Sequence, residues 1–453
     1  MKPAFRLSVI AAALSCTIAT PVVAQDAAAP TAEQSLAEMR AQLAALASRI
    51  DQLEGELAQE KAANAAQDAS IAANTEAVAK PAPAPTPAVA QLEKKDGWSF
   101  KPRGRLMFDA GFTSVPESTG REDGFASEVR RARLGASGGL GGGFEYKFEL
   151  DFAGNEVEAA DAYLSYGNGP LEVIVGHHNN FQSLEELTSS LHTSFIERAA
   201  FTDAFGFERR IGASVSYSQG IVLAQAGVFT DNFDDTSTNN RGIDGRLVVM
   251  PKMGDTQLHF GGSLHFNELG EDAGSVRYRQ RPLVHFTSER FVNTGNLAAD
   301  SEFGAGLEAA MISGPFHAAA EGFWQNVDMP AMTDSPTFFG GYAEVGYFLT
   351  KGDTRGYKDG KFDRTKPASA VGEGGIGSIQ LNLRYDYLDL NDAGIIGGVQ
   401  NGYLASLVWK PTDYTLFSLN YGKMDYDDAA YATATGDTSY TVDAFGVRAQ
   451  VDF

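Results

Sequence analysis

The segment FEYKFELDF, residues 144–152, alternates apolar and charged side chains along its whole length. Five apolar residues share one face of an extended chain: Phe144, Tyr146, Phe148, Leu150 and Phe152. A period of two predicts a β-strand with one apolar and one polar face. The same alternation recurs at residues 379–387 and 445–453. It is typical both of a soluble β-sandwich, whose apolar face packs inward, and of an outer-membrane barrel, whose apolar face meets lipid.

Three features of the wider sequence favour the membrane barrel. Full charges such as Lys147 and Arg384 fall in mid-strand, where a water-filled lumen would accommodate them. Short turns, such as GNGP at 167–170, alternate with long loops, such as 268–301. The chain ends on Phe453 behind alternating apolar residues, which resembles the outer-membrane barrel assembly signal. We therefore predict an all-β fold, an antiparallel transmembrane β-barrel in the outer membrane of a Gram-negative bacterium.

The predicted strands number sixteen, enough to leave an open channel rather than a packed interior. They lie near 103–112, 126–139, 143–153, 158–167, 171–178, 209–218, 221–232, 240–250, 255–267, 302–312, 316–327, 336–349, 377–390, 402–410, 414–426 and 441–453. This even number leaves both ends of the barrel on the periplasmic side. One connection, 350–376, is long although it falls on the side of the short turns, and the sequence offers no physical reason for its length.

The residues before the barrel divide into three segments. Residues 1–24 join a basic start, an apolar stretch and small residues, which predicts a secretory signal peptide; a lipoprotein signal at Cys16 is the alternative. Residues 33–78 carry apolar residues at alternating spacings of three and four, which predicts an α-helical coiled-coil stalk in the periplasm. Residues 79–97 form a Pro/Ala-rich linker, and the porin-like β-barrel spans 98–453.

The segment VRYRQRP, residues 276–282, places arginines at every second position although the chain has a formal net charge of -22. In an extended chain, Arg277, Arg279 and Arg281 point the same way, about 7 Å apart. The predicted topology puts them in the extracellular connection 268–301. There they either contact lipopolysaccharide phosphates and solvent, or line the lumen of the barrel.

Other basic residues favour the lumen. Arg131 and Arg133 lie on the polar face of the second predicted strand, and a bulge would also turn Arg130 inward. Arg105, on the first strand, is their neighbour in a closed sheet. Guanidinium groups stay charged at physiological pH and bind phosphate oxygens through a planar fork, so the arginines predict an anion pathway.

Six ordered motifs of the barrel region resemble the phosphate-selective porins O and P. They are RGRLMFDAGF (103–112), EVRRARLG (128–135), FQSLEELTSSLHTSFIER (181–198), YRQRP (278–282), FVNTG (291–295) and YFLTKGDTRGYKDGKFDRTKP (347–367). The resemblance implies a sixteen-stranded barrel, a homotrimer, and a basic ladder that passes anions to a constriction. Its ladder positions fall on Arg105, Arg130, Arg131, Arg277, Arg279 and Arg281, with Arg133 as a further candidate.

The connection 179–208 is long enough to fold inward and narrow the pore. Ser183 and Glu186 have the spacing of a capping box, which predicts a short helix at SLEELTSS. The resemblance implies a lysine at the constriction in this region, but here SSLHTSF offers only His192. We expect a histidine to become charged only in a mildly acidic medium, so this departure weakens the prediction of strict phosphate specificity.

The sequence therefore predicts an anion-selective outer-membrane porin for phosphate or polyphosphate. A general diffusion porin is the first alternative, and the second is a barrel-anchored tether whose stalk contacts peptidoglycan. We expect the lipid bilayer and lipopolysaccharide as surroundings. The acidic chain argues against nucleic acid as a partner. The seven histidines, His177 and His178 included, have no nucleophile or metal-site context, so we predict no enzyme, no cofactor and no metal.

Overall fold

The computed structural model describes residues 92–93, 97–154, 156–233, 238–270, 273–330 and 334–453, together with Gly55 and Lys61. The predicted signal peptide lies outside the described residues. So do the predicted stalk and linker, apart from positions 55, 61, 92–93 and 97. No helix within the described ranges is long and apolar enough to cross a membrane.

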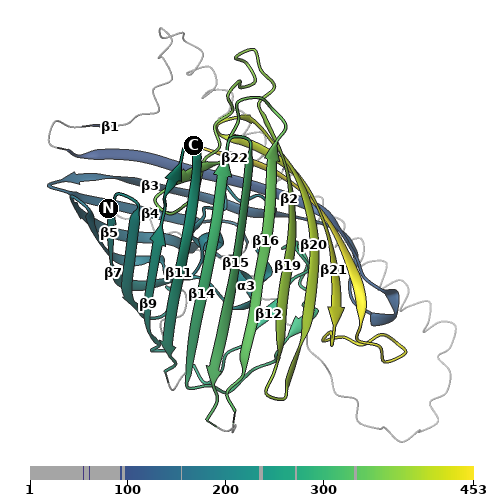
Figure 1. Cartoon of the computed structure of the whole chain (residues 1–453). Helices are drawn as coiled ribbons and strands as arrows, with labels where there is room; N and C mark the ends of the chain where they lie inside the picture. The colour runs from purple at the N-terminus through teal and green to yellow at the C-terminus, as the bar shows by residue number, and fades with distance from the viewer. Residues whose placement is uncertain are drawn as a thin grey trace, which may run out of the picture. The chain divides into compact units, whose positions relative to one another are not determined.

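Sixteen long antiparallel strands close into a barrel, because β2 pairs with β3 on one side and with β22 on the other (Figure 1). They are β2 (Ser99–Ser114), β3 (Gly124–Gly141), β4 (Phe144–Asp151), β5 (Glu158–Asn168), β6 (Leu171–Asn179), β7 (Arg209–Gln219), β8 (Val222–Phe229), β9 (Arg241–Val249), β11 (Thr256–Glu268), β14 (Ser301–Ser313), β15 (Phe316–Asp328), β16 (Thr337–Phe348), β19 (Ser378–Asp392), β20 (Ile395–Thr412), β21 (Thr415–Asp427) and β22 (Tyr440–Asp452). The short strands β1 (Leu92–Glu93) and β10 (Lys252–Met253) pair with β2 and β11. The predicted sixteen-stranded barrel is confirmed.

The largest boundary error concerns β20. The sequence predicted a loop before residue 402, but β20 begins at Ile395 and forms a hairpin with β19. Only Ala393 and Gly394 separate the two strands, and both have a positive φ, 47° and 81°. This is the backbone of a tight hairpin turn, which glycine adopts freely and alanine rarely does, so the sequence signal was weak.

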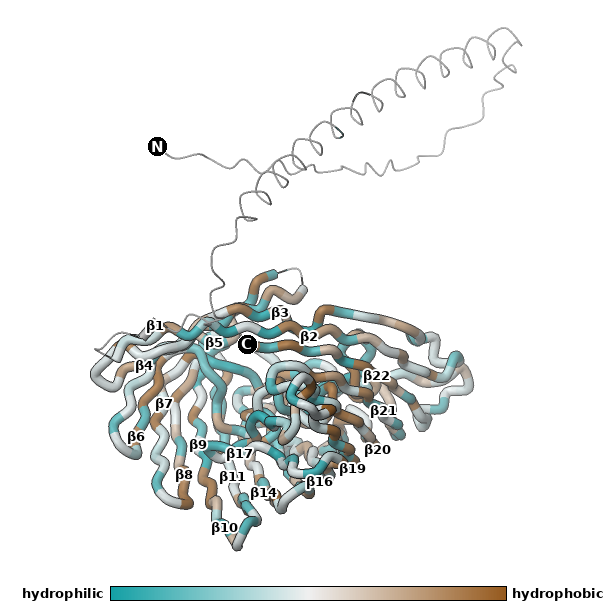
Figure 2. Tube along the Cα trace, turned by 90° about the horizontal axis from the view of Figure 1, so that it is seen from above, coloured by the Kyte–Doolittle hydropathy of each residue, from teal (hydrophilic) through white to brown (hydrophobic). Residues whose placement is uncertain are grey.

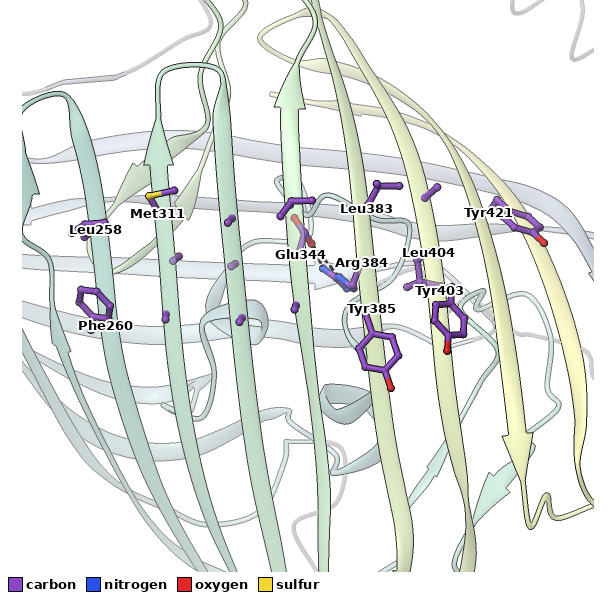
Figure 3. A pocket seen from close by; sticks show the side chains of 18 residues that line it. Leu258, Phe260, Met311, Glu344, Leu383, Arg384, Tyr385, Tyr403, Leu404 and Tyr421 are labelled. Carbon is purple, nitrogen blue, oxygen red and sulfur yellow. Dashed lines mark hydrogen bonds and ion pairs between the residues drawn. The ribbon is translucent and has the colours of Figure 1, made fainter.

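The barrel is apolar outside and polar inside. On β2, Leu106, Phe108 and Phe112 point outward and are 48%, 49% and 53% exposed, whereas Asp109 on the inner face is 1% exposed. Figure 3 shows the same division farther round the wall: Tyr385 and Tyr403 project from one face, and Glu344 and Arg384 meet on the other. This inversion of the soluble pattern is what a lipid-facing barrel requires.

The connection between β6 and β7 fills one side of the lumen. It contains α2 (Leu184–Leu187) and α3 (Ala200–Ala204), and most of its residues are buried. Ser183 caps α2 by accepting a hydrogen bond from the Glu186 backbone N–H at 3.2 Å, as the capping spacing predicted. The connection predicted at 179–208 does fold inward, and we call its residues 180–208, between β6 and β7, the constriction loop.

The long connection between β16 and β19 also enters the barrel, from the end that carries the short turns. It forms a small hairpin of β17 (Gly356–Lys358) and β18 (Lys361–Asp363). Figure 2 places β17 inside the ring of strands. Arg355 donates to Ser194 Oγ at 2.8 Å and to the His192 carbonyl at 2.6 Å, so this connection braces the constriction loop. Its length, which the sequence left unexplained, thus follows from the distance it spans within the lumen.

Candidate anion pathway

Two cavities lie between the constriction loop and the wall formed by β2–β8. The loop-end cavity, of about 260 Å³, is lined by the constriction loop, β3 and part of the connection 269–300. The turn-end cavity, of about 780 Å³, reaches the short turns at 143 and 167–170. Five residues line both cavities and so mark their junction: Arg131, Arg133, Glu186, Arg198 and Arg209.

Arg131 differs from the other arginines of the junction. Arg133 bonds Asp151 at 2.6 Å, Arg209 bonds Asp161 at 2.8 Å, and Arg198 lies 3.4 Å from Glu186. Within the described part of the chain, Arg131 makes no ion pair; its Nη1 lies 3.8 Å from Met107 Sδ. It is also 92% buried, since only 8% of its surface is exposed. Among the four arginines of the junction, Arg131 is therefore the one without an ion pair in the described structure.

Arg130 turns inward because β3 carries a bulge at this residue. The pairing of β2 with β3 shifts between Met107 and Phe108, whose partners are Arg131 and Val129. Arg130 then reaches Glu197 of the constriction loop through two hydrogen bonds, of 2.7 and 3.0 Å. Burial alone would raise the pKa of Glu197, but Arg130, Arg131 and Arg448 hold that pKa well below its usual range. Arg130 therefore fastens the loop as well as lining the loop-end cavity.

Arg105 lies on the turn-end side of the junction. Its guanidinium donates to Ser190 Oγ of the constriction loop at 3.1 Å and to Glu149 at 3.3 Å. The same face of β2 carries Lys101 and Arg103 at the two preceding alternate positions, and both line a further cavity at the turn end. This second alternating run, KPRGR at 101–105, has the same spacing as VRYRQRP, but Lys101 and Arg103 were not among the predicted pore residues.

The segment VRYRQRP is extended, and its alternate residues differ in burial. Tyr278 and Gln280 are 2% and 5% exposed, and Tyr278 donates to Glu302 on the barrel wall at 2.6 Å. The three arginines take the opposite, more exposed face, with Arg279 in the short strand β12 (Arg279–Gln280), which pairs with β13 (Val292–Asn293). Arg281 lines the loop-end cavity; Arg277 and Arg279 line neither of the two cavities.

His192 lies away from the junction. It lines neither cavity, its side chain is 8% exposed, and its Nε2 lies 3.6 Å from Asp363 of β18. Burial, with Lys410 and Arg364 nearby, lowers its pKa to about 3. Burial and these two cations disfavour the charged form of His192, contrary to the expectation that it becomes charged in a mildly acidic medium.

Arg198, Arg209 and Lys361 also line the turn-end cavity, although none was predicted as a pore residue; Lys147, predicted to face the lumen, lines it too. Arg198 ends the motif at 181–198, but its place depends on how the constriction loop folds.

The two cavities differ in the balance of charged side chains that line them. The loop-end cavity has six arginines (Arg130, Arg131, Arg133, Arg198, Arg209, Arg281) and six carboxylates (Asp151, Glu158, Glu186, Glu197, Asp203, Glu208). The turn-end cavity has seven cations (Arg105, Arg131, Arg133, Lys147, Arg198, Arg209, Lys361) and five carboxylates (Glu145, Asp161, Glu172, Glu186, Asp359).

An apolar outer wall around charged cavities defines a membrane channel of the porin class. The chain belongs to the phosphate-selective porin O and P family, whose model matches residues 100–453. It is therefore an outer-membrane porin, a channel rather than an enzyme. An uncharacterized protein of Caulobacter vibrioides is 44% identical over an alignment 475 positions long, which covers 99% of this chain and 96% of that protein.

Solved porin structures share the fold at low sequence identity. The anion-selective porin from Comamonas acidovorans matches with a TM-score of 0.52 and 13% identity. The match covers 79% of this chain and 100% of that chain. OmpT of Vibrio cholerae, an outer-membrane protein, has a TM-score of 0.51 and 10% identity, over 80% of this chain and 100% of its own. At these identities the likeness supports the fold alone.

Proposed function

We propose that this porin is anion-selective and passes phosphate or polyphosphate through the two cavities, with Arg131 as the central contact. The observation that carries the proposal is the position of Arg131: it lines both cavities, is nearly buried, and has no carboxylate partner among the described residues. An anion entering the junction meets a cation that makes no direct ion pair with a described carboxylate. The fixed arginine replaces water of hydration, which is how a selective channel lowers the cost of entry.

The other basic residues extend this contact in both directions. Arg281 lines the entrance on the loop end, with Arg279 and Arg277 at alternate positions beyond it. Burial and the nearby Arg281 lower the pKa of Arg290 to about 10, so this neighbour still carries charge at physiological pH. Arg105, Arg103 and Lys101 continue on the turn end. A phosphate ion would pass between sites about 7 Å apart, each strong enough to bind and weak enough to release.

The triple substitution of Arg277, Arg279 and Arg281 by alanine tests the entrance. We expect chloride current to persist, because Arg131 remains, but phosphate to block it less strongly, because fewer cations attract phosphate to the entrance. The measurement is a phosphate titration of chloride conductance in planar bilayers at low and high ionic strength. The difference in phosphate block between the wild type and the triple variant should become smaller at high ionic strength, because salt screens the long-range attraction between phosphate and these arginines. Equal block by the wild type and the triple variant at low salt would remove these residues from the pathway.

A general diffusion porin is the second candidate, and one observation favours it. The loop-end cavity carries as many carboxylates as arginines, so its average charge offers no selectivity. The two candidates differ in what governs passage: the local field of Arg131 in one case, and the mean charge of the lining in the other. Ion selectivity therefore discriminates between them directly.

We also propose that the barrel assembles as a trimer in the outer membrane, with its long loops outside the cell. Support comes from the family and from the trimer form of Vibrio cholerae OmpT, which has a TM-score of 0.50 and 11% identity. The many apolar side chains of the outer wall, such as Phe108 and Phe125, suit either lipid or a neighbouring barrel.

A further inference from the structure

Glu186 is the junction residue that the proposed anion pathway does not need. It lines both cavities and is 7% exposed. Its carboxylate is the single acidic group among the five residues that the two described cavities share. A carboxylate at this point opposes the passage of an anion, so its presence calls for a reason.

Glu186 is held at the junction by the helix on which it lies. Glu321 of β15 accepts hydrogen bonds from Ser183 Oγ and from the backbone N–H groups of Leu184 and Glu185, at 2.9, 2.9 and 2.7 Å. The next residue along, Glu185, bonds Arg384 at 2.7 Å. These bonds fix α2 against the wall, so the Glu186 side chain has little freedom to leave the junction.

Arg198 is held independently of the Glu186 carboxylate. Its guanidinium donates to the backbone carbonyls of Glu185, Glu186 and Thr188 at 3.0, 3.1 and 2.9 Å. These three bonds persist when the Glu186 side chain changes its charge, whereas the ion pair of 3.4 Å does not. Protonation of Glu186 would therefore leave Arg198 in place with its charge no longer compensated.

The charged groups that face Glu186 come from every neighbouring element. Arg131 and Arg133 belong to β3, Arg209 to β7, and Arg198 and Glu185 to the constriction loop. The wall carboxylates of this region already have partners: Asp151 of β4 bonds Arg133, and Asp161 of β5 bonds both Arg209 and Lys147. Glu186 also has a partner, Arg198 at 3.4 Å, but it is the carboxylate that lines both described cavities, so its charge acts directly at the junction.

We propose that Glu186 tunes the selectivity of the channel: deprotonated, it cancels one arginine at the junction, and protonated, it leaves the arginines to attract anions. The inference rests on the proposed function, because it assumes that ions cross at the junction. If Glu186 has this role, the selectivity for anions increases as the medium becomes more acidic, even for an anion that does not itself titrate.

The pKa of Glu186 is shifted in the direction that this inference requires. Burial raises the pKa of Glu186 above its ordinary value, and Arg198, Arg209 and Arg131 offset only part of the rise. Glu186 therefore takes up its proton at a higher pH than an exposed glutamate, whose pKa is about 4.3. Acidification adds positive charge at the junction before most other carboxylates titrate.

The test compares the wild type with Glu186→Gln in planar bilayers under a KCl gradient at about pH 7.5 and pH 5.5, where ordinary carboxylates stay ionised. Chloride replaces phosphate as the probe, because chloride carries no proton. We expect the chloride-to-potassium permeability ratio of the wild type to be higher at the lower pH, because Glu186 takes up its proton at a higher pH than an exposed glutamate. Glu186→Gln should show the higher ratio already at pH 7.5, with a smaller response to acid.

Glu172→Gln is the matched control, because Glu172 lines the turn-end cavity but lies outside the junction. It should keep the wild-type response. His177, His178 and His285 also line the cavities, but they are present in all three proteins and do not affect the comparison. Circular dichroism before and after heating shows whether each variant keeps the folded barrel.

The outcomes separate the inference from the proposed function. An acid response in Glu186→Gln as large as that of the wild type would overturn the inference and leave the anion pathway standing. A wild type that prefers potassium at pH 7.5 would overturn the proposed function, while the difference between the two responses would still decide the role of Glu186.

Discussion

Replacing Arg131 with glutamine weakens phosphate block of chloride current by about ten- to hundredfold. This corresponds to the roughly 1.5–3 kcal/mol that a hydrogen bond to a charged group contributes. The effect is large because Arg131 lies at the junction without an ion-pair partner in the described structure, so no other group compensates for its loss. For the same reason, the substitution leaves no carboxylate unpaired and the barrel should fold normally. A phosphate titration of single-channel chloride conductance measures the change.

The control for this substitution is Arg121→Gln. Arg121 lies over the ring of Tyr431 at 4.5 Å and lines neither cavity. The Arg121→Gln substitution removes one positive charge, as Arg131→Gln does, and should leave the phosphate block of the chloride current unchanged. If Arg131→Gln retains the wild-type block, phosphate does not bind at the junction and the central contact lies elsewhere.

Replacing Arg384 with methionine should loosen the constriction loop and destabilise the protein by about 3–5 kcal/mol, the usual cost of removing one partner from a buried ion pair. Arg384 is 3% exposed and bonds Glu185 of the loop at 2.7 Å and Glu344 of β16 at 2.6 Å. Its guanidinium also lies 4.6 Å from the ring centres of Phe195 and Tyr342. Without it, two buried carboxylates face each other, and α2 keeps its hydrogen bonds to Glu321 but loses the ion pair of Glu185 with the wall.

Two readouts follow from this prediction. The free energy of unfolding, from urea titration in detergent, should fall, and single-channel conductance should rise because the loop occupies less of the lumen. The triple variant Arg384→Met, Glu185→Gln, Glu344→Gln removes the unpaired charges and should recover much of the stability. A variant with wild-type conductance and wild-type unfolding energy would show that the loop is anchored elsewhere, for instance by Glu321.

The strands could be predicted because their signal is local. Residues 143–153 were predicted as a strand, and β4 spans Phe144–Asp151, since alternation fixes which face meets lipid. The hairpin turn at Ala393 and Gly394 could not be predicted from the sequence, because alanine rarely adopts a positive φ. The length of the connection 350–376 could not be explained from the sequence either, because its reason is a contact of Arg355 with Ser194, which lies 161 residues earlier.

The candidate site was harder to predict, because its geometry depends on two loops that enter the barrel. Arg105, Arg130 and Arg131 could be placed near one another from strand order, which neighbouring strands determine. Arg198 could not, because backbone carbonyls of the folded loop position it. The prediction that a water-filled lumen surrounds mid-strand charges holds for Lys147, which lines the turn-end cavity. It is wrong for Arg384, which the constriction loop covers.

The reversal potential of the wild-type channel under a KCl gradient, followed by addition of phosphate, tests the central claim most directly. The proposed pathway predicts a reversal potential shifted toward that of chloride, and a chloride current that phosphate blocks in a saturable way. A reversal potential near zero or shifted toward that of potassium, with no saturable block by phosphate, would contradict it and leave a general diffusion porin as the function of this barrel.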